Sequence, residues 1–516
     1  MEPAPPRTHR EPWIFLVACV AVGLAFQGSR GLFETDEGRY AECAREMVAT
    51  GDWLVPLLQG VPHLTKPPGA YWLIAAGLEA FGRNEWGARA FLGIALALSA
   101  ICVRTIGRVL LDDAGGARAG WCYLAMAYPF AAGSILTTDT FLAAGVLGAL
   151  ACAASALRAA RPAPWFVGAA ACLAIAAFVK GHLALVPWVT FAAGFLLVRD
   201  RPPWRWWMGV AAATVVGVLA GFAWFWWAAA NVPGAEEHFR REIAMRLEGT
   251  GDHAPRPWWF YFEVLAAGTC PWWIQIVRGV RSVTWRRRAA DPADHSRDPV
   301  GAHPRPGPTL APPRARGQVP GASGPDDAAR VLLFWAAATF LVFQIVPAKM
   351  PLYVLPVAAP LALWAARGTR EPGSPWPARP WILGVWIAFL LGVRWYAATL
   401  HEDPRDMRRL AAAVVRADPT GTAPVSVYMG ADVQGLDFYL DGRPQRVRTR
   451  QVWTRRSTVR AHNAAARRAA RGETWLLVVE DHEGTDAEVA AIAGSTAHLA
   501  EAIPGYRVYR IVPAPR

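Results

Sequence analysis

Charged residues are scarce in this sequence of 516 residues. Only 18% of the residues are charged, whereas a soluble globular protein carries about 25%. Hydrophobic residues make up 54% and gather in runs with few or no charges, at 13–29, 91–111, 208–230 and 331–346. Such runs approach or exceed the ~17 residues that span a bilayer. The composition therefore argues against a soluble enzyme and predicts a membrane protein with several spans.

Lysine is scarcer still, because only Lys66, Lys180 and Lys349 occur among the 53 basic residues. In a soluble protein the net charge of +13 would suggest nucleic-acid binding. Here cytoplasmic loops that fix orientation in the membrane explain the excess better, so we expect no nucleic-acid partner. In a chain so rich in arginine, the three lysines are candidates for positions where arginine would not serve. The alternative is that they snorkel at helix ends.

Cysteine is also too sparse and too scattered to define a site. The seven cysteines lie mostly inside apolar runs and form no CxxC pair or other metal-ligand spacing, so neither a disulfide framework nor a zinc site is supported. We expect no cofactor, although two carboxylates, Asp36 and Asp139, leave a shared divalent metal open. An internal sequence repeat is missing too, which weakens the case for a transporter built from inverted repeats.

The apolar runs predict a mainly α, polytopic membrane fold. Connections rich in arginine alternate with connections that are nearly free of basic residues or balanced by acids. By the positive-inside rule, the N-terminus is then cytoplasmic and residues 30–85 form the first external loop. The sequence contains eleven candidate spans in all, the first of them before this loop: residues 13–29, 86–111, 119–134, 138–158, 164–179, 182–198, 207–230, 258–279, 330–346, 351–366 and 380–397.

Two segments differ from the membrane part, which we assign to residues 1–397. Residues 281–329 are rich in Pro, Arg, Asp and Gly and predict a disordered cytoplasmic loop. Residues 398–516 have the composition of a soluble protein and predict a small α/β domain on the external face. Within it we expect strands at 425–429, 475–480 and 506–512 and helices at 405–416 and 458–471.

The first external loop holds the residues best suited to chemistry: Asp36, Glu37, Arg39, Tyr40 and Lys66. Arg39 begins a helical spacing continued by Cys43 and Glu46, which predicts a short helix. A phosphate on a lipid needs a cation at headgroup depth. A hydroxyl or phosphate nucleophile needs a carboxylate that orients it or accepts its proton. The alternative is a solvated amphipathic helix whose charges form surface ion pairs.

Asp139 is a second carboxylate, at a span boundary on the same external side. An ionisable group among apolar residues costs free energy unless it has a partner or a function. The alternative is that Asp139 caps a helix beginning at Thr140. Lys66, Lys180 and Lys349 reach the same side in this topology, and compact ammonium groups bind phosphate well. Together they predict a site for an anionic headgroup.

The order of these residues resembles the bacterial aminoarabinose transferase (ArnT-like) and protein mannosyltransferase superfamily. The first-loop pattern is Asp36-Glu37-x-Arg39-Tyr40-Ala41-Glu42, Gly51-Asp52-Trp53, Lys66-Pro67 and Gly69-x-Tyr71-Trp72. Further matches are Thr138-Asp139, Lys180-Gly181, His253-x-Pro255-x-Pro257-Trp258, Cys270-Pro271-Trp272 and Lys349-x-Pro351-x-Tyr353. The resemblance implies a GT-C fold with about eleven to thirteen transmembrane helices and a small periplasmic α/β domain at the C-terminal end.

The resemblance also implies roles for individual residues. Asp36 and Asp139 would be the catalytic carboxylates. Arg39, Lys66 and Lys349 would contact the phosphate of a polyprenyl-phosphate sugar. The supporting residues would be Glu37, Tyr40, Lys180 and Tyr353.

The implied protein is an inner-membrane glycosyltransferase without a metal requirement. It would move a sugar from the polyprenyl-phosphate donor to a lipid, glycan or protein acceptor on the periplasmic face. Thr65 departs from the pattern, because aminoarabinose transferases often carry an acid before the loop lysine. The sugar and the acceptor therefore stay open. The alternative from another class is a transporter of lipids or lipid-linked sugars, which would use the same basic site without breaking a bond.

Overall fold

The computed structural model describes residues 11–248, 256–289, 325–347, 349–371, 374, 380–427, 433–441, 473–483, 485–493 and 497–512. The chain divides into two compact units. The helical unit comprises Met1–Gly23, Ile94–Gly133 and Thr138–Ala388. The loop–sheet unit comprises Leu24–Gly93, Ser134–Thr137 and Phe389–Arg516. Three of the boundaries, at residues 23/24, 93/94 and 388/389, fall inside helices.

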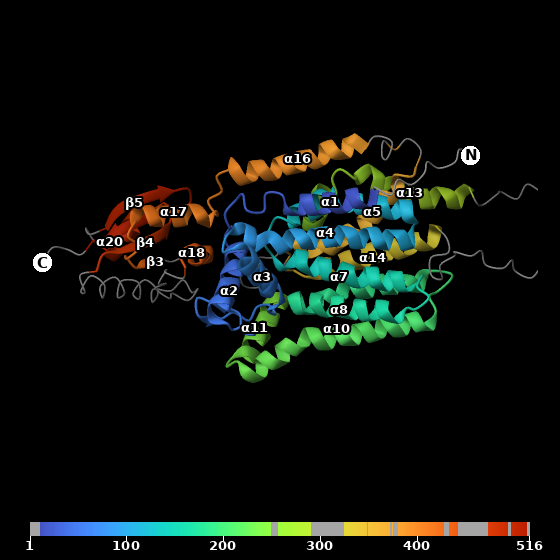
Figure 1. Cartoon of the computed structure of the whole chain (residues 1–516), viewed down its shortest axis with the longest axis horizontal. Coiled ribbons are helices and arrows are strands. Elements are labelled where there is room, and N and C mark those ends of the chain that lie inside the picture. Colours follow the sequence, from blue (N-terminus) through green and yellow to red (C-terminus); the bar gives the residue numbers. More distant parts are fainter. Residues whose placement is uncertain are drawn as a thin grey trace, which may run out of the picture. The chain divides into compact units, whose positions relative to one another are not determined.

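Helices, most of them apolar, make up the helical unit (Figure 1). Some of them continue into the loop–sheet unit. The α-helices are α1 (Glu11–Leu24), α4 (Glu85–Leu110), α5 (Asp113–Leu124), α6 (Ala127–Ala132), α7 (Thr138–Ala156), α8 (Ala163–Lys180), α9 (Leu185–Gly194), α10 (Trp204–Asn231), α11 (Ala235–Glu248), α12 (Phe260–Gly268), α13 (Trp273–Ala289), α14 (Pro325–Ile345), α15 (Ala358–Gly368) and α16 (Pro380–Thr399). Three 3₁₀ segments join them: η1 (Gly181–Ala184), η2 (Phe195–Leu197) and η3 (Pro351–Val357).

The described part of the chain contains six helical stretches that are long and apolar enough to cross a membrane. They are Glu85–Leu110, Thr138–Ala156, Ala163–Leu197, Trp204–Asn231, Asp327–Ile345 and Pro380–Thr399. Shorter apolar helices lie at Glu11–Leu24 and Gly69–Phe81. The predicted multi-pass membrane character is thereby confirmed, and so is the mainly α fold class.

Several expected spans are interrupted. The expected span at 119–134 is divided between α5 and α6, the one at 258–279 between α12 and α13, and the one at 351–366 between η3 and α15. Proline lies at or near each interruption, at Pro129, Pro271 and Pro356. Proline lacks an N–H donor and clashes with the preceding turn of a helix. Apolar composition alone does not reveal such interruptions.

Small residues allow the long helices of the helical unit to approach closely. Helix α8 packs against both α7 and α10, as Figure 1 also shows. A Cβ atom at Gly221 of α10 would lie 2.3 Å from the Cβ atom of Ala177 in α8, and one at Gly145 of α7 would lie 2.9 Å from Ala176. Helices in membranes associate through such small residues because lipid offers no hydrophobic driving force between them.

The loop–sheet unit combines the first loop with the C-terminal domain. Its elements are α2 (Asp36–Thr50), β1 (Leu57–Leu58), β2 (Val61–Pro62), α3 (Gly69–Phe81), α17 (Met407–Ala417), β3 (Val425–Val427), α18 (Gln434–Tyr439), β4 (Trp475–Glu480), α20 (Thr485–Ala493), β5 (Ala497–Ile503) and β6 (Tyr506–Ile511). Strands β3 to β6 form one sheet in the order β3-β4-β6-β5. Only the β3–β4 pair is parallel; the β4–β6 and β5–β6 pairs are antiparallel.

Alternating side chains of β4 build a core on each face of this sheet. Leu476 and Val478 join the core that includes residues of α17 and α18. Leu477 and Val479 join the core that includes Val489 of α20. This period of two is what the strand geometry requires. The predicted small α/β domain is thus present in the C-terminal part of the chain.

The predicted elements of this domain were partly right. The strands expected at 425–429, 475–480 and 506–512 correspond to β3, β4 and β6, and the helix expected at 405–416 corresponds to α17. Strand β5 and helices α18 and α20 were not predicted. The helix expected at 458–471 lies outside the described residues. Of the expected loop 281–329, the two ends belong to α13 and α14, and residues 290–324 lie outside the described residues.

Candidate active site

Helix α2 carries most of the predicted first-loop residues. It begins at Asp36 and ends where Gly51 takes a φ of 72°, with the Gly51 N–H donating to the Met47 carbonyl over 2.9 Å. Glycine at this position is the usual way for a helix to end in a left-handed residue. The predicted short helix is therefore present. The alternative of a solvated amphipathic helix is wrong, because most of α2 is buried.

Asp36 and Arg39 are the partly exposed charged pair at the start of α2. Their side chains form an ion pair and are 34% and 26% exposed, respectively. The Arg39 guanidinium also lies 5.8 Å from the Tyr40 ring centroid. Its buried Nε atom has no hydrogen-bond partner among the described residues. The pair thus offers a carboxylate and a donor that a phosphate oxygen could use.

A chain of aromatic contacts leads from Tyr40 toward the loop that holds Lys66. The Tyr40 and Tyr71 ring centroids are 5.7 Å apart, and those of Tyr71 and His63 are 6.5 Å apart. His63 Nε2 lies 2.6 Å from the Thr65 hydroxyl, and Lys66 Nζ donates to the Thr65 carbonyl over 3.3 Å. The Tyr71 hydroxyl is buried with no hydrogen-bond partner among the described residues. Within this unit, the structure thus links the aromatic and basic residues of the first loop.

A short hairpin supports this loop. Strands β1 and β2 are joined by Gln59 and Gly60, both with positive φ, as a tight two-residue turn requires. Their backbone N–H groups donate to the Glu46 carboxylate over 2.5 and 3.0 Å. Glu46 of α2 therefore fixes the hairpin that precedes Lys66.

Glu37 is buried in the loop–sheet unit, where its carboxylate accepts hydrogen bonds from several parts of the chain. Its carboxylate accepts hydrogen bonds from Arg30 over 2.5 and 2.8 Å and from Arg89 over 2.8 and 3.2 Å. It also accepts from the backbone N–H groups of Phe33, over 2.9 Å, and Leu136, over 2.7 Å. Burial by itself would raise the pKa of Glu37, but the two guanidinium groups hold that pKa well below its usual value. These contacts indicate that Glu37 positions backbone and is not itself free to react.

Asp139 and Lys180 form a buried pair in the helical unit. Lys180 Nζ lies 2.5 Å from Asp139 Oδ1, and the two side chains are only 3% and 10% exposed. Lys180 Nζ also lies 4.6 Å from the Tyr353 ring centroid. Helix α7 begins at Thr138, so Asp139 lies inside the first turn and not at the capping position. Lys180 does not snorkel, because it is buried and paired.

Lys349 is also buried in the helical unit, with 6% of its surface exposed. No hydrogen bond or ion pair joins it to another of the described residues. It precedes η3, which carries Tyr353. The structure thus brings Asp139, Lys180 and Tyr353 together, and Lys349 lies four residues before Tyr353 in the sequence.

Sequence reasoning missed the residues that surround these predicted ones. Arg30 and Arg89 hold Glu37, and Tyr71 and His63 continue the contacts of Tyr40. Arg89 carried a signal, because a lone charge near the start of an apolar run demands a partner. His63 and Tyr71 lie in a loop whose folding the sequence pattern does not give.

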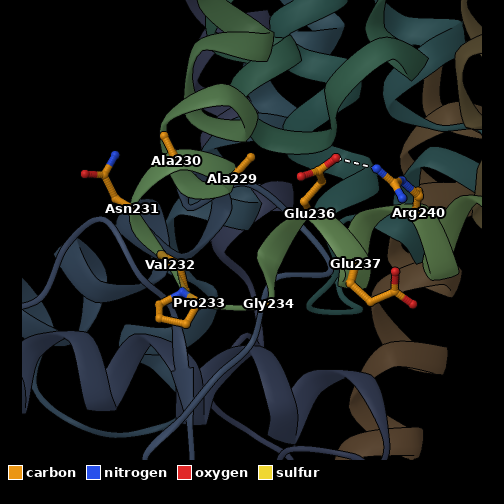
Figure 2. Close-up of a pocket in the computed structure, with 9 residues that line it drawn as sticks. All are labelled: Ala229, Ala230, Asn231, Val232, Pro233, Gly234, Glu236, Glu237 and Arg240. Atoms are coloured by element: carbon orange, nitrogen blue, oxygen red, sulfur yellow. Dashed lines mark hydrogen bonds and ion pairs between the residues drawn. The ribbon is translucent and has the colours of Figure 1, made fainter.

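A separate open cavity of about 470 Å³ lies where α10 meets α11 (Figure 2). It is lined by the end of α10 and by Glu236, Glu237 and Arg240, and Figure 2 shows Glu236 directed toward Arg240. None of the predicted site residues lines it. The described residues contain no group of three or more His, Cys, Asp or Glu side chains that could hold a metal ion.

Comparison with known proteins finds one matching family model and several similar transferases. Residues 65–227 match the family model of dolichyl-phosphate-mannose-protein mannosyltransferase. An undecaprenyl phosphate-alpha-4-amino-4-deoxy-L-arabinose arabinosyl transferase of Sodalis glossinidius is 29% identical over 70% of this chain and 59% of its own length. A transferase with the same name from Pseudomonas paraeruginosa is 29% identical over 69% of this chain and 59% of its own length. The chain thus spans about three fifths of these relatives.

Solved structures extend the match to nearly the whole chain. ArnT from Cupriavidus metallidurans, bound to undecaprenyl phosphate, superposes with a TM-score of 0.71 at 19% identity over 99% of this chain and 100% of that one. The oligosaccharyltransferase of Archaeoglobus fulgidus superposes with a TM-score of 0.58 at 11% identity over 98% of this chain and 74% of that one. The fold is therefore the GT-C fold. The resemblance predicted from the first-loop motif is confirmed, because the chain is similar to these transferases in sequence and to ArnT in fold.

Proposed function

We propose that this protein is a membrane glycosyltransferase that moves a sugar from a polyprenyl-phosphate donor, most simply undecaprenyl phosphate carrying one sugar, to a lipid, glycan or protein acceptor. The observation that carries the proposal is the Asp36–Arg39 pair. It is the partly exposed charged pair at the start of an otherwise mostly buried helix. The names of the relatives support the donor class, and none of them identifies the acceptor used by this chain.

The chemistry needs a base and a stabilised leaving group. The acceptor hydroxyl oxygen would attack the anomeric carbon of the sugar, and the bond from that carbon to the phosphate oxygen would break. The electron pair would leave on the polyprenyl phosphate, and the hydroxyl proton would pass to the Asp36 carboxylate. Arg39, Lys66 and Lys349 would neutralise the charge that develops on the phosphate, usually the largest contribution to catalysis.

Asp139 is the second predicted catalytic carboxylate, and its ion pair with Lys180 limits the role that it can have in this reaction. Because Lys180 already balances its charge, Asp139 would act as a fixed member of the site with Lys180 and Tyr353 around it. Tyr40 would support the Arg39 side, where its ring contacts the guanidinium. Glu37 would hold the backbone around Asp36.

The direct test supplies undecaprenyl phosphate carrying radiolabelled 4-amino-4-deoxy-L-arabinose to membranes that contain the full chain. A glycosyltransferase moves the label to a membrane lipid, glycan or protein fraction and releases undecaprenyl phosphate. A transporter, the alternative from another class, moves the label across the bilayer still attached to its lipid. If no fraction gains label with this donor, hexose and other pentose donors are tested. Absence of transfer with all of them contradicts the proposal.

We also propose that the chain lies in the inner membrane with a cytoplasmic N-terminus and a periplasmic C-terminal domain. The arginine-rich connections support this orientation through the positive-inside rule. A reporter that is active only in the periplasm should be active when fused after Arg516 and silent when inserted within 290–320. An active reporter at 290–320 would reverse the orientation and place the first loop in the cytoplasm.

The proposed reaction uses no metal, because the three basic side chains supply the positive charge. Transfer should therefore proceed at an undiminished rate after dialysis against a chelator. A loss of transfer that returns with Mg²⁺ or Mn²⁺ would instead indicate that the carboxylates hold a cation.

A further inference from the structure

Helix α2 has a second face, opposite to the one that carries Asp36. Gly38, Glu42 and Arg45 follow one another at helical spacing and lie across the helix from Asp36 and Tyr40. This second face contacts α18 of the C-terminal domain within the loop–sheet unit. The proposed chemistry leaves the contact unused.

The two helices meet through glycine on both sides. A Cβ atom on Gly38 would lie 2.6 Å from the backbone N and Cα of Gly435, and one on Gly435 would lie 3.0 Å from the Cα of Gly38. Real Cβ atoms do not approach backbone at 2.6 Å, so only glycine fits at Gly38. The Gly435 N–H also donates to the Glu34 carboxylate over 3.0 and 3.1 Å. Glu34 lies two residues before Asp36.

Polar contacts surround this glycine contact. The Leu32 N–H donates to the Tyr439 hydroxyl over 2.9 Å, and that hydroxyl donates to Glu85 over 3.0 Å. Gln59, in the hairpin that precedes Lys66, donates to the buried Asp437. Arg83 donates to the Phe438 carbonyl over 2.8 Å. Residues 434–439 are thus bound to the chain on both sides of α2.

We propose that α18 positions the first loop for catalysis, so that the C-terminal domain fixes the orientation of α2 and thereby of Asp36 and Arg39. Gly435 and Tyr439 are the positioning residues in this contact between α18 and α2. The inference rests on the proposed function for its link to catalysis, whereas the docking itself can be measured without any substrate.

Two variants test the docking by different means. Gly435→Ala adds a methyl group at the glycine contact, and because alanine favours helix more than glycine, a loss cannot come from helix propensity. Tyr439→Phe removes a hydroxyl and adds no volume, so it weakens the docking without a clash. Gly392→Ala is the matched control, since a Cβ atom there meets nothing within 4 Å.

The readouts are the turnover number and KM for undecaprenyl phosphate carrying labelled aminoarabinose, and the hydrogen exchange of the α2 amides, all on purified full chain. We expect the turnover number to fall roughly 10- to 100-fold in Gly435→Ala, because small displacements of reacting groups cost this much. We expect a smaller fall of roughly 2- to 10-fold in Tyr439→Phe, which loses the two hydrogen bonds of its hydroxyl but keeps its ring in place. Donor KM should change little, α2 should exchange faster, and Gly392→Ala should match the wild type.

The outcomes separate the possible failures. If folded protein becomes scarcer while its turnover number and α2 exchange stay at wild-type values, α18 is merely structural and the inference is wrong. Unchanged turnover and exchange in both variants would also overturn it. If the wild type transfers no sugar from any donor, the proposed function fails. The exchange comparison then still decides whether α18 holds α2, and unaltered exchange would overturn the docking as well.

Discussion

Two carboxylate–cation pairs, one in each unit, differ in how far they are open to water. The Asp36–Arg39 side chains are 34% and 26% exposed, whereas those of Asp139 and Lys180 are 10% and 3% exposed. An exposed pair contributes about 0–1 kcal/mol to stability. A buried pair is costly to form, and removing one partner leaves an uncompensated charge. The exposed pair can therefore exchange partners with a substrate, and the buried pair is a fixed part of the structure.

This difference in exposure indicates different roles for Asp36 and Asp139, which the sequence pattern predicts as equivalent catalytic carboxylates. In the proposed reaction, Asp36 would leave Arg39 when a phosphate takes over the guanidinium, whose buried Nε has no hydrogen-bond partner among the described residues. Asp139 keeps Lys180 beside it, and Lys180 also contacts the Tyr353 ring. Substitutions at the two pairs test whether the buried pair contributes to stability and the partly exposed pair does not.

The largest effect is expected at Lys180. Lys180→Met leaves Asp139 buried without its cation, so we expect a loss of about 3–5 kcal/mol in stability, measured by thermal unfolding in detergent. The double variant Asp139→Asn with Lys180→Met should recover most of that stability and stay deficient in sugar transfer. Arg39→Ala, the comparison in the exposed pair, should change stability by about 1 kcal/mol or less. Equal destabilisation by both single variants would erase the contrast.

A smaller effect is expected at Lys66. A charge-assisted contact contributes about 1.5–3 kcal/mol, so Lys66→Ala should lower transfer efficiency roughly 10- to 150-fold. Lys66→Arg should recover only part of this, because a planar guanidinium replaces a compact ammonium. Arg240→Lys, in an exposed helical pair with Glu236, is the control for basic substitutions and should have no effect. Full activity in Lys66→Arg would make the surviving lysine an accident of composition, and full activity in Lys66→Ala would move the phosphate to Lys349 or Arg39.

A different kind of effect, on the pH dependence of stability, is expected at a third pair, Glu42–Arg45, on the second face of α2. Burial raises the pKa of Glu42 to about 7, although Arg45 opposes this shift, and Asp437 and Glu46 add to it. The folded protein then holds a proton that the unfolded chain releases. The contribution of this protonated Glu42 to the free energy of unfolding is complete below about pH 4.5 and is lost as the pH rises through about 7. Glu42→Gln should remove this pH dependence from thermal unfolding between pH 5 and 8, and Glu236→Gln should retain it.

The membrane architecture and the first-loop helix were predictable because they rest on local signals. Long apolar runs and their arginine flanks gave the spans, and the spacing of Arg39, Cys43 and Glu46 gave α2. The interruptions at Pro129 and Pro271 were missed, because an apolar run looks the same whether its helix is continuous or broken. The strands β3, β4 and β6 were found from their β-branched and aromatic residues, and β5 (Ala-His-Leu-Ala-Glu-Ala-Ile) lacks that signal.

The partners of the site residues were not predictable, since they are contacts between distant parts of the chain. Arg89 lies 52 residues from Glu37, and Lys180 lies 41 residues from Asp139. Sequence spacing identified each predicted carboxylate as unusual, but only the folded chain distinguishes a paired acid such as Glu37 from a partly exposed one such as Asp36. The same holds for Gly38 and Gly435, whose contact has no local signature.

The most direct test of the central claim is the rate of sugar transfer by Asp36→Asn, measured in a single turnover with donor already bound. Asparagine keeps the shape of the side chain and removes both its charge and its capacity as a base. We expect transfer at least ~100-fold slower than in the wild type, with binding of undecaprenyl phosphate no weaker than in the wild type, unchanged protein level in the membrane and full activity in Glu236→Gln. A near-normal rate in Asp36→Asn would remove Asp36 from the chemistry and contradict the account.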